Sequence, residues 1–404
     1  MSSHDQDTTM DTGKRTALYD AHVAAGASMV RVDGWELPSQ YSEGPEAEHL
    51  WTRSRCSICD FSHLSRISIA GADALPFLQR VLTSNVAALE LGSAQYGILA
   101  NENGSALDEG YLYRFEEGKY LFVGNAAPRE RTLAYLKEAG CQDRVTIKDD
   151  TFRYAAIAVQ GPDSEKILKI LSGGREITDH RKGSLNILDL EGRRIWMART
   201  GYTGGSGCYE AYLENEDAVW FWERLRALGA RPAGLTARDT LRIEAGLPHF
   251  GQEFGLDREG KEMPAFAVPL ARFAVSFVEE KGDFVGKTAL ARQYDAFLRI
   301  QAGNFNDISA LPRRIIPIAL TSAGTLREGM DVRYRGKPVG YVTSAAAVTY
   351  FRPLVQEASG SEHLDIARRS IGLAYLASEL SDGAEIEVDV CGQWERASVV
   401  ARHM

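Results

Sequence analysis

The sequence predicts an α+β protein that is built on antiparallel sheets and followed by a C-terminal β-barrel. Up to about residue 290, amphipathic helices mix with strand pairs joined by tight turns, without the strand–helix alternation of a parallel sheet. Beyond about residue 310, short strands broken by glycine turns are typical of a small barrel or sandwich. The hydrophobic fraction of 44% in 404 residues is sufficient for two or three domains with ordinary cores.

The N-terminal half is predicted to contain helices around a strand meander. Residues 1–15 are expected to be a disordered tail, followed by a helix in "TALYDAHVAAGASMV", a loop in "GWELPSQY" and a helix in "GADALPFLQRVLTSNVAAL". The run "AQYGILANENGSALDEGYLYRFEEGKYLFVGNAA" predicts a meander of short strands. The segment "PRERTLAYLKEAG" then predicts a helix that ends at its glycine.

The following segments predict a second set of strands and helices. "RYAAIAVQGPDSEKILKIL" indicates a strand, a turn and a helix, and "NILDLEGRRIWMARTGYTGGSGCYEAYL" indicates two successive hairpins. "EDAVWFWERLRALGA" and "GLTARDTLRIEAGL" are predicted helices, the second with Thr236 as its N-cap. From about Gln293 the pattern loosens into a linker-like stretch before the strands of the barrel.

Composition and charge exclude several classes of partner. The net charge of −9 and the absence of a Lys/Arg-rich run predict no nucleic-acid or membrane partner. No apolar run approaches the roughly 20 residues of a membrane helix, and the first residues lack the order of a signal peptide. Five scattered cysteines suit a reducing compartment, and "CSIC" lacks the second ligand pair of a metal site. We therefore expect a cytoplasmic protein without a metal.

Two adjacent carboxylates stand out in the predicted meander, within "NENGSALDEGYLYRF". Taking Asn103-Gly104 as a two-residue hairpin loop sets a register in which Asn101 faces Ala106, Ile98 faces Glu109 and Tyr96 faces Tyr111. Strand alternation then places Glu109 among tyrosines, whereas Asp108 shares the other face with Arg114 and is expected to be structural, held by an ordinary ion pair. The two acids are thus predicted to have different roles.

The aromatic face around Glu109 has two interpretations. A carboxylate there is costly unless it is paired or used, and partial burial would raise its pKa toward the range of proton transfer near neutrality. Aromatic side chains around one acid also form a slot for a flat heterocycle whose nitrogens need a hydrogen-bond partner. The alternative is an exposed strand whose tyrosine hydroxyls contact solvent.

Eight motifs occur in an order that resembles the aminomethyltransferase, or T-protein, family of the glycine cleavage system. They are "DGWELPSQY", "CDFSHLSRISIAG", "NENGSALDEGYLYRF", "VGNAAPRER", "QGPDSEKIL", "RTGYTGGSGCYE", "PAGLTARDTLRIEAGLPHFGQE" and "GDFVGKTAL". The resemblance implies a three-domain cloverleaf around a tetrahydrofolate site. In this chain it implies a folate-binding core over 16–295, in which residues 66–151 form an inserted α+β part between 16–65 and 152–295, and a barrel over 310–404.

The resemblance also implies an activity and its residues. Family members move an aminomethyl group from the lipoyl arm of a carrier, the H-protein, to tetrahydrofolate, and a carboxylate near the reacting carbon can stabilise positive charge and manage the proton. Glu109 occupies the position of the family's acid, and Arg238 lies with it in the implied catalytic pair. The implied folate-site residues are Leu64, Tyr96, Asp108, Tyr113, Asn125, Tyr202 and Glu210, with Glu210 on the amino-pyrimidine edge of the pterin.

Departures from the family pattern leave alternatives open. Glu109 replaces an aspartate, Gly110 replaces a leucine and is expected to open space, and "DHRKG" replaces an aromatic pair. "FRPLVQEASGSEHLDIARR" looks like an insertion in the barrel. The first alternative is a folate-dependent demethylase of a small N-, O- or S-methyl compound. The second is a non-catalytic folate-binding protein that assists iron–sulfur assembly, although the cysteine motif of that group is absent.

Overall fold

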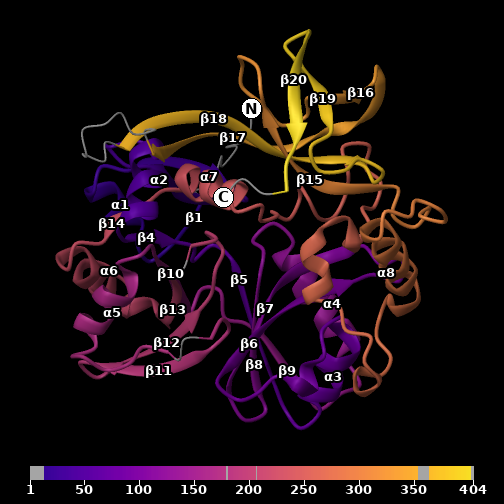
Figure 1. The fold of residues 1–404 in the computed structure, drawn as a ribbon. Coiled ribbons are helices and arrows are strands. Elements are labelled where there is room, and N and C mark those ends of the chain that lie inside the picture. The colour runs from indigo at the N-terminus through magenta and orange to yellow at the C-terminus, as the bar shows by residue number, and fades with distance from the viewer. Residues whose placement is uncertain (1–12, 179–180, 206, 354–363, 402–404) are drawn as a thin grey trace, which may run out of the picture.

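The computed structural model describes residues 13–178, 181–205, 207–353 and 364–401. Two sheets lie side by side in the lower half of Figure 1, and a closed barrel lies above them. This arrangement confirms the predicted α+β fold with antiparallel sheets and a C-terminal barrel. We propose that these three units are the domains predicted from the sequence, with the second sheet inserted within the first unit.

The first sheet has six strands, in the order β11-β12-β13-β10-β4-β14. Its central strand β10 is buried throughout, because alternate side chains enter cores on its two faces. Helices α5 and α6 cover one face, with Trp222 fully buried against it. The elements are β4 (Ser57–Asp60), β10 (Tyr154–Gln160), α5 (Ser164–Leu171), β11 (Leu185–Leu190), β12 (Arg193–Arg199), β13 (Cys208–Glu214), α6 (Ala218–Ala227) and β14 (Arg231–Pro232).

The second sheet has five strands, in the order β6-β7-β8-β5-β9, and contains the predicted meander. Helices α3 and α4 cover its outer face, while its inner face packs against the first sheet through Tyr113, Leu121 and Val123. The functional cavity described below lies at this junction. The elements are β5 (Ser65–Ala70), α3 (Ala74–Val81), β6 (Ser93–Ala100), β7 (Ala106–Glu116), β8 (Lys119–Gly124), α4 (Arg129–Ala139) and β9 (Thr146–Asp149).

The barrel closes in the order β15-β18-β17-β16-β19-β20. Its long hairpin of β17 and β18 extends over α2 (Pro45–Ser54) and α7 (Leu235–Glu244), as Figure 1 shows. There Ile243 packs against Ala346, Val348 and Ile371, which joins the barrel to the core. The strands are β15 (Arg313–Leu320), β16 (Asp331–Tyr334), β17 (Lys337–Pro353), β18 (Leu364–Ala377), β19 (Glu385–Val390) and β20 (Gln393–Val399).

The remaining elements are short, apart from α8 along the second sheet. A three-stranded sheet, in the order β1-β3-β2, lies near α1. These elements are β1 (Lys14–Arg15), α1 (Tyr19–Ala24), β2 (Ser28–Val32), β3 (Trp35–Gln40) and α8 (Lys287–Gln301), with 3-10 turns η1 (Val86–Ala88), η2 (Asn215–Asp217), η3 (Ala265–Ala267), η4 (Pro269–Phe273) and η5 (Glu279–Lys281).

The structure corrects four expectations about individual segments. The loop expected in "GWELPSQY" is instead strand β3, which pairs with β1 and β2. Lys14 and Arg15, assigned to the tail, form β1 against β3, while residues 1–12 lie outside the described part. The linker expected from Gln293 begins only after Gln301, because Gln293, Phe297 and Ile300 give its first part a buried helical face in α8. Gly234, not Thr236, is the N-cap of α7, and no side chain caps that end.

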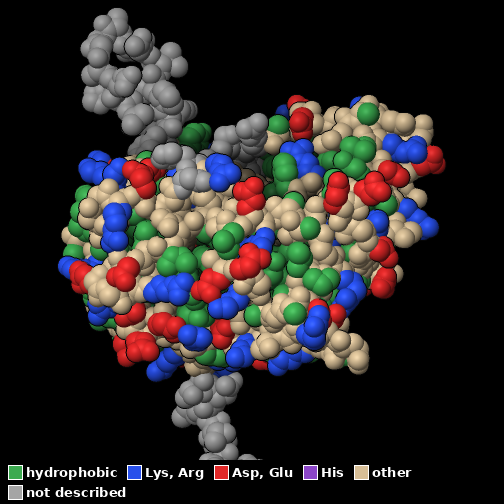
Figure 2. Space-filling view, turned by 90° about the horizontal axis from the view of Figure 1, so that it is seen from below, with side chains coloured by type: hydrophobic (Ala, Val, Ile, Leu, Met, Phe, Trp, Pro, Cys, Tyr) green, Lys and Arg blue, Asp and Glu red, His purple; other side chains and the backbone are tan. Residues whose placement is uncertain are grey.

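The surface mixes charges of both signs. Figure 2 shows acidic and basic side chains interspersed over the face seen from below. Within the described residues, every helix is too short or too polar to cross a membrane.

Candidate functional site

The β6–β7 hairpin has the predicted pairing over most of its length. Tyr96 pairs with Tyr111 and Ile98 with Glu109, as the sequence indicated. The register shifts beyond Leu99, so Ala106 pairs with Ala100 and not with Asn101. The turn is also longer than two residues, because the Asn101 side-chain oxygen accepts hydrogen bonds from the backbone N–H groups of Asn103 and Ser105, each at 3.0 Å.

A cavity between the two sheets collects most of the predicted site residues. Strands β6, β7 and β13, helix α7 and the loop after it all contribute to its walls. Eight of the nine predicted residues line it, namely Leu64, Tyr96, Glu109, Tyr113, Asn125, Tyr202, Glu210 and Arg238, and Asp108 alone does not.

Glu109 faces this cavity, where the Asn125 amide holds its carboxyl. The Asn125 Nδ2 donates to Glu109 Oε1 at 3.0 Å and also to the Glu109 carbonyl at 3.0 Å. Burial raises the pKa of Glu109, while Asn125, Tyr96 and Arg238 oppose the rise. The Glu109 carboxyl can therefore hold or release a proton closer to neutrality than a solvated glutamate.

Asp108 points the other way and is sealed within the protein. Its carboxylate accepts hydrogen bonds from the backbone N–H of Glu109 at 2.8 Å, from Asn125 Nδ2 at 2.9 Å and from Thr132 Oγ1 at 3.0 Å. The expected ion pair with Arg114 is wrong, because Arg114 donates to the Leu89 carbonyl and to Glu117 instead. Asp108 does not line the cavity, so the structure gives it no direct contact with a ligand there.

Glu210 lies at the end of the cavity that is formed by β13. The hydroxyls of Tyr113 and Tyr212 both donate to Glu210 Oε2, each at 2.6 Å. Sequence reasoning missed Tyr212, which is fully buried. Its position two residues after Glu210 on the same strand face was the available signal. The tyrosines fix one carboxylate oxygen and direct the group toward the cavity.

Arg238 and Tyr202 lie near the junction of this cavity with a second pocket. The Arg238 guanidinium carbon lies 4.5 Å from the centre of the Tyr202 ring, and the Tyr202 hydroxyl donates to the Pro248 carbonyl at 3.2 Å. Sequence reasoning also missed His249, which lines both pockets. Arg238 thus places a positive charge near Glu109, where it lowers the pKa of that carboxyl.

Gly110 does not open the space that its replacement of leucine suggested. A Cβ atom at this position would lie 2.0 Å from the Val123 carbonyl oxygen on β8. The close approach of the two strands therefore requires glycine here, and the backbone of β8 occupies the space.

The cavity combines aromatic walls with fixed polar groups, which suits a flat heterocycle. Phe61, Tyr111 and Tyr113 supply aromatic walls, and Glu210 supplies a fixed acceptor for paired N–H groups. The buried Tyr96 hydroxyl lies in the same cavity, where it acts as a hydrogen-bond partner of Glu109 and lowers the pKa of that carboxyl. Glu109 lies in the same cavity, where it can act on a carbon attached to such a ligand.

A family model, curated relatives and a solved structure that resemble this chain all belong to one family. The family model described as GCVT N-terminal domain matches residues 18–264. The chain is 36% identical over 375 residues to an aminomethyltransferase of Rubrobacter xylanophilus, covering 93% of this chain and 90% of the relative. It is 33% identical to that of Bacillus subtilis, covering 96% and 98%. The crystal structure of glycine cleavage system aminomethyltransferase T from Bartonella henselae aligns with a TM-score of 0.78 at 25% identity, covering 96% of this chain and 97% of that chain.

Proposed function

Since the chain belongs to the aminomethyltransferase family, we propose that it transfers an aminomethyl group from a lipoyl-carrying H-protein to tetrahydrofolate, giving methylene-tetrahydrofolate. It is an enzyme of the transferase class. The observation that carries the proposal is the placement of two carboxyl groups, Glu109 and Glu210, in one aromatic cavity with different partners.

Glu210 would bind the amino-pyrimidine edge of the pterin. Its Oε2 is already held by two tyrosine hydroxyls, which fixes the plane in which the carboxylate accepts further N–H groups. The aromatic walls exclude water from the ring system and strengthen these hydrogen bonds. Tetrahydrofolate would supply the nitrogen that accepts the one-carbon unit.

Glu109 would act at the carbon that is transferred. Its raised pKa suits a carboxyl that takes up or releases a proton, and its ionised form stabilises positive charge on a nearby carbon. Asn125 holds the Oε1 oxygen of Glu109, and the Glu109 side chain lines the cavity. Arg238 favours the ionised form, which suits the second of these tasks.

The test is calorimetric titration with tetrahydrofolate, followed by an assay with aminomethylated H-protein. We expect saturable binding and formation of methylene-tetrahydrofolate. Binding without that product would overturn aminomethyl transfer, and product from a methylated small molecule would indicate demethylation instead. Failure to bind tetrahydrofolate would overturn the folate site.

A matched pair of variants on β13 sharpens the folate part of the proposal. Glu210→Gln keeps the shape but loses the charge, so we expect tetrahydrofolate affinity to fall about 10- to 100-fold, as for a charge-assisted hydrogen bond. Glu214→Gln is the control, because Glu214 lies on the same strand and pairs with the exposed Arg153 at 2.9 Å. Equal affinities of the two variants in calorimetry would contradict the assignment of Glu210.

A further inference from the structure

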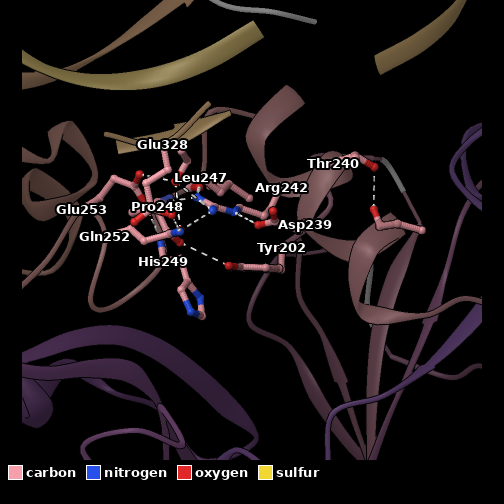
Figure 3. A network of polar contacts seen from close by, with 12 residues as sticks. Tyr202, Asp239, Thr240, Arg242, Leu247, Pro248, His249, Gln252, Glu253 and Glu328 are labelled. Carbon is pink, nitrogen blue, oxygen red and sulfur yellow. Dashed lines mark hydrogen bonds and ion pairs between the residues drawn. The ribbon is translucent and has the colours of Figure 1, made fainter. Parts of the chain in front are cut away.

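A buried guanidinium stands behind the cavity wall, on α7. Arg242 is 1% exposed, and its hydrogen bonds use all the N–H donors of an arginine side chain (Figure 3). The acceptors are Gln252 Oε1 at 2.6 Å, Asp239 Oδ1 at 2.7 Å, Ser344 Oγ at 2.9 Å, Glu253 Oε2 at 3.0 Å and the Leu247 carbonyl at 3.2 Å. Ser344 belongs to β17, so this network joins the core to the barrel.

The network fixes the backbone of the loop that follows α7. Arg242 holds the Leu247 carbonyl, Tyr202 holds the Pro248 carbonyl and Glu253 Oε2 accepts the His249 N–H at 2.8 Å. These three loop residues all line the cavity. Each of these three residues is held by a separate hydrogen bond, so this part of the cavity wall is preorganised. Its backbone has little conformational freedom left to lose when a ligand binds.

The His249 imidazole is the group that this loop presents. Figure 3 shows the ring projecting away from the network, and within the described part of the chain the structure shows no hydrogen bond to its nitrogens. Burial and the charges of Arg242 and Arg238 lower the pKa of His249 to about 4, against the opposing effect of Asp239. His63, which also lines the second pocket, is likewise held uncharged. At neutral pH His249 therefore offers one N–H donor and one nitrogen acceptor.

The position of His249 indicates which substrate it meets. Glu210 lines the first pocket only, whereas His249 also lines the second pocket, as do Asn125 and Arg238. A pterin held at Glu210 would therefore occupy the end of the cavity away from this junction. The one-carbon donor must bring its carbon to the reacting nitrogen of the folate from another direction, and the junction is where the second pocket meets the first.

Building on the proposed function, we infer that His249 contacts the one-carbon donor and accepts a hydrogen bond from an N–H group beside the transferred carbon. Arg242 and Glu253 are the positioning residues that hold His249 in place. An uncharged acceptor at this point favours an aminomethyl compound, which carries such an N–H group, over a quaternary N-methyl, O-methyl or S-methyl compound, which does not.

Two substitutions of His249 test the contact. For His249→Phe we expect the KM for aminomethylated H-protein to rise about tenfold, the effect of one lost hydrogen bond. The kcat and the Kd for tetrahydrofolate should change less than about twofold on the same scale. His249→Gln, which restores a neutral donor and acceptor, should recover most of the loss.

The outcomes separate this inference from the proposed function. If the wild-type protein binds tetrahydrofolate but gives no product with the carrier, both are overturned. If the wild-type protein turns over and His249→Phe leaves the KM for the carrier unchanged, only the inference about His249 is overturned. An increase in the Kd for tetrahydrofolate without a change in that KM would place His249 on the pterin instead, which also overturns it.

A matched pair of carboxylates tests the positioning role. Glu253→Gln should raise the KM for the carrier about tenfold at unchanged kcat, because the His249 N–H and Arg242 lose a charged acceptor. Asp331→Asn is the control, since Asp331 pairs with Arg258 at 2.7 Å on the exposed side of the same core–barrel junction. Ser344→Ala is a milder change, because it removes only one of the acceptors of Arg242. A thermal unfolding scan checks that this variant remains folded. If both network variants behave like Asp331→Asn, the positioning role is wrong.

Discussion

The two faces of strand β7 carry adjacent carboxylates in contrasting surroundings. Asp108 is fully enclosed by hydrogen-bond donors from the backbone, Asn125 and Thr132 on α4, whereas Glu109 faces the cavity. There its partners are the Asn125 amide and Tyr96. Asn125 bonds to both acids, so it links the enclosed face to the open one. The role of each acid on β7 therefore depends on the segments that pack against its face of the strand. Where those segments supply enough hydrogen-bond donors, the acid supports the fold, and where they do not, it remains available for chemistry.

The largest expected effect is on turnover, from Glu109→Gln. The amide keeps the shape but cannot exchange a proton or carry charge, so we expect kcat with the aminomethylated carrier to fall about 100-fold or more. The free energy of unfolding in urea should change by about 1 kcal/mol or less. Glu117→Gln is the control, because the Glu117 side chain is 79% exposed beyond the end of the same strand. Equal turnover in the two variants would contradict the catalytic role of Glu109.

The next effect is on stability, from Asp108→Ala. This change leaves the backbone N–H groups of Glu109 and Asn125 and the Thr132 hydroxyl without this acceptor in a buried place. The Asn125 amide loses one of its three acceptors. We expect the free energy of unfolding to fall by about 3 kcal/mol or more. Urea denaturation measures it, and a loss below about 1 kcal/mol, as at an ordinary surface position, would show that Asp108 does not support the fold.

The third expected effect concerns the pH dependence of stability. Burial raises the pKa of Asp108 to about 7, against its hydrogen bonds to Asn125 and to the Glu109 N–H. In an unfolded chain that pKa is about 4. Between these values the folded protein binds more protons than the unfolded chain, so this group lowers the free energy of unfolding as the pH rises from about 4 to about 7.

The Asp108→Asn variant isolates this contribution. The difference in free energy of unfolding between the wild-type protein and the variant should decline across that pH window and level off above it. Titrating groups remote from Asp108 cancel in the difference, whereas Glu109 is coupled to Asp108 through its charge and the shared Asn125 amide. A difference that rises with pH would show that the hydrogen bonds outweigh burial and hold the pKa of Asp108 low.

Local patterns predicted the elements that depend on near neighbours in the sequence. The alternation in β7 placed Glu109, Tyr111 and Tyr113 on one face, and the β6–β7 and β11–β12–β13 pairs and the barrel were identified in order. The small sheet around β3 was missed, because Gly34 and Pro38 indicated a loop there. The partners of Asp108 were missed because Asn125 and Thr132 follow a further strand, β8, and only tertiary packing brings them under β7. The same limit applies to the buried face of α8, which exists because the core packs against it.

The sequence by itself determined which side chains share a strand face and, through its ordered motifs, which family the chain resembles. Only the tertiary structure decided that Glu109 and Glu210, from different sheets, face one cavity and that Gly110 is required by the approach of β8. It also decided that His249 is presented there by Arg242 and Glu253. The physical reason is that strand periodicity is a property of adjacent residues, whereas burial, close approach and hydrogen-bond partners depend on segments far apart in the chain.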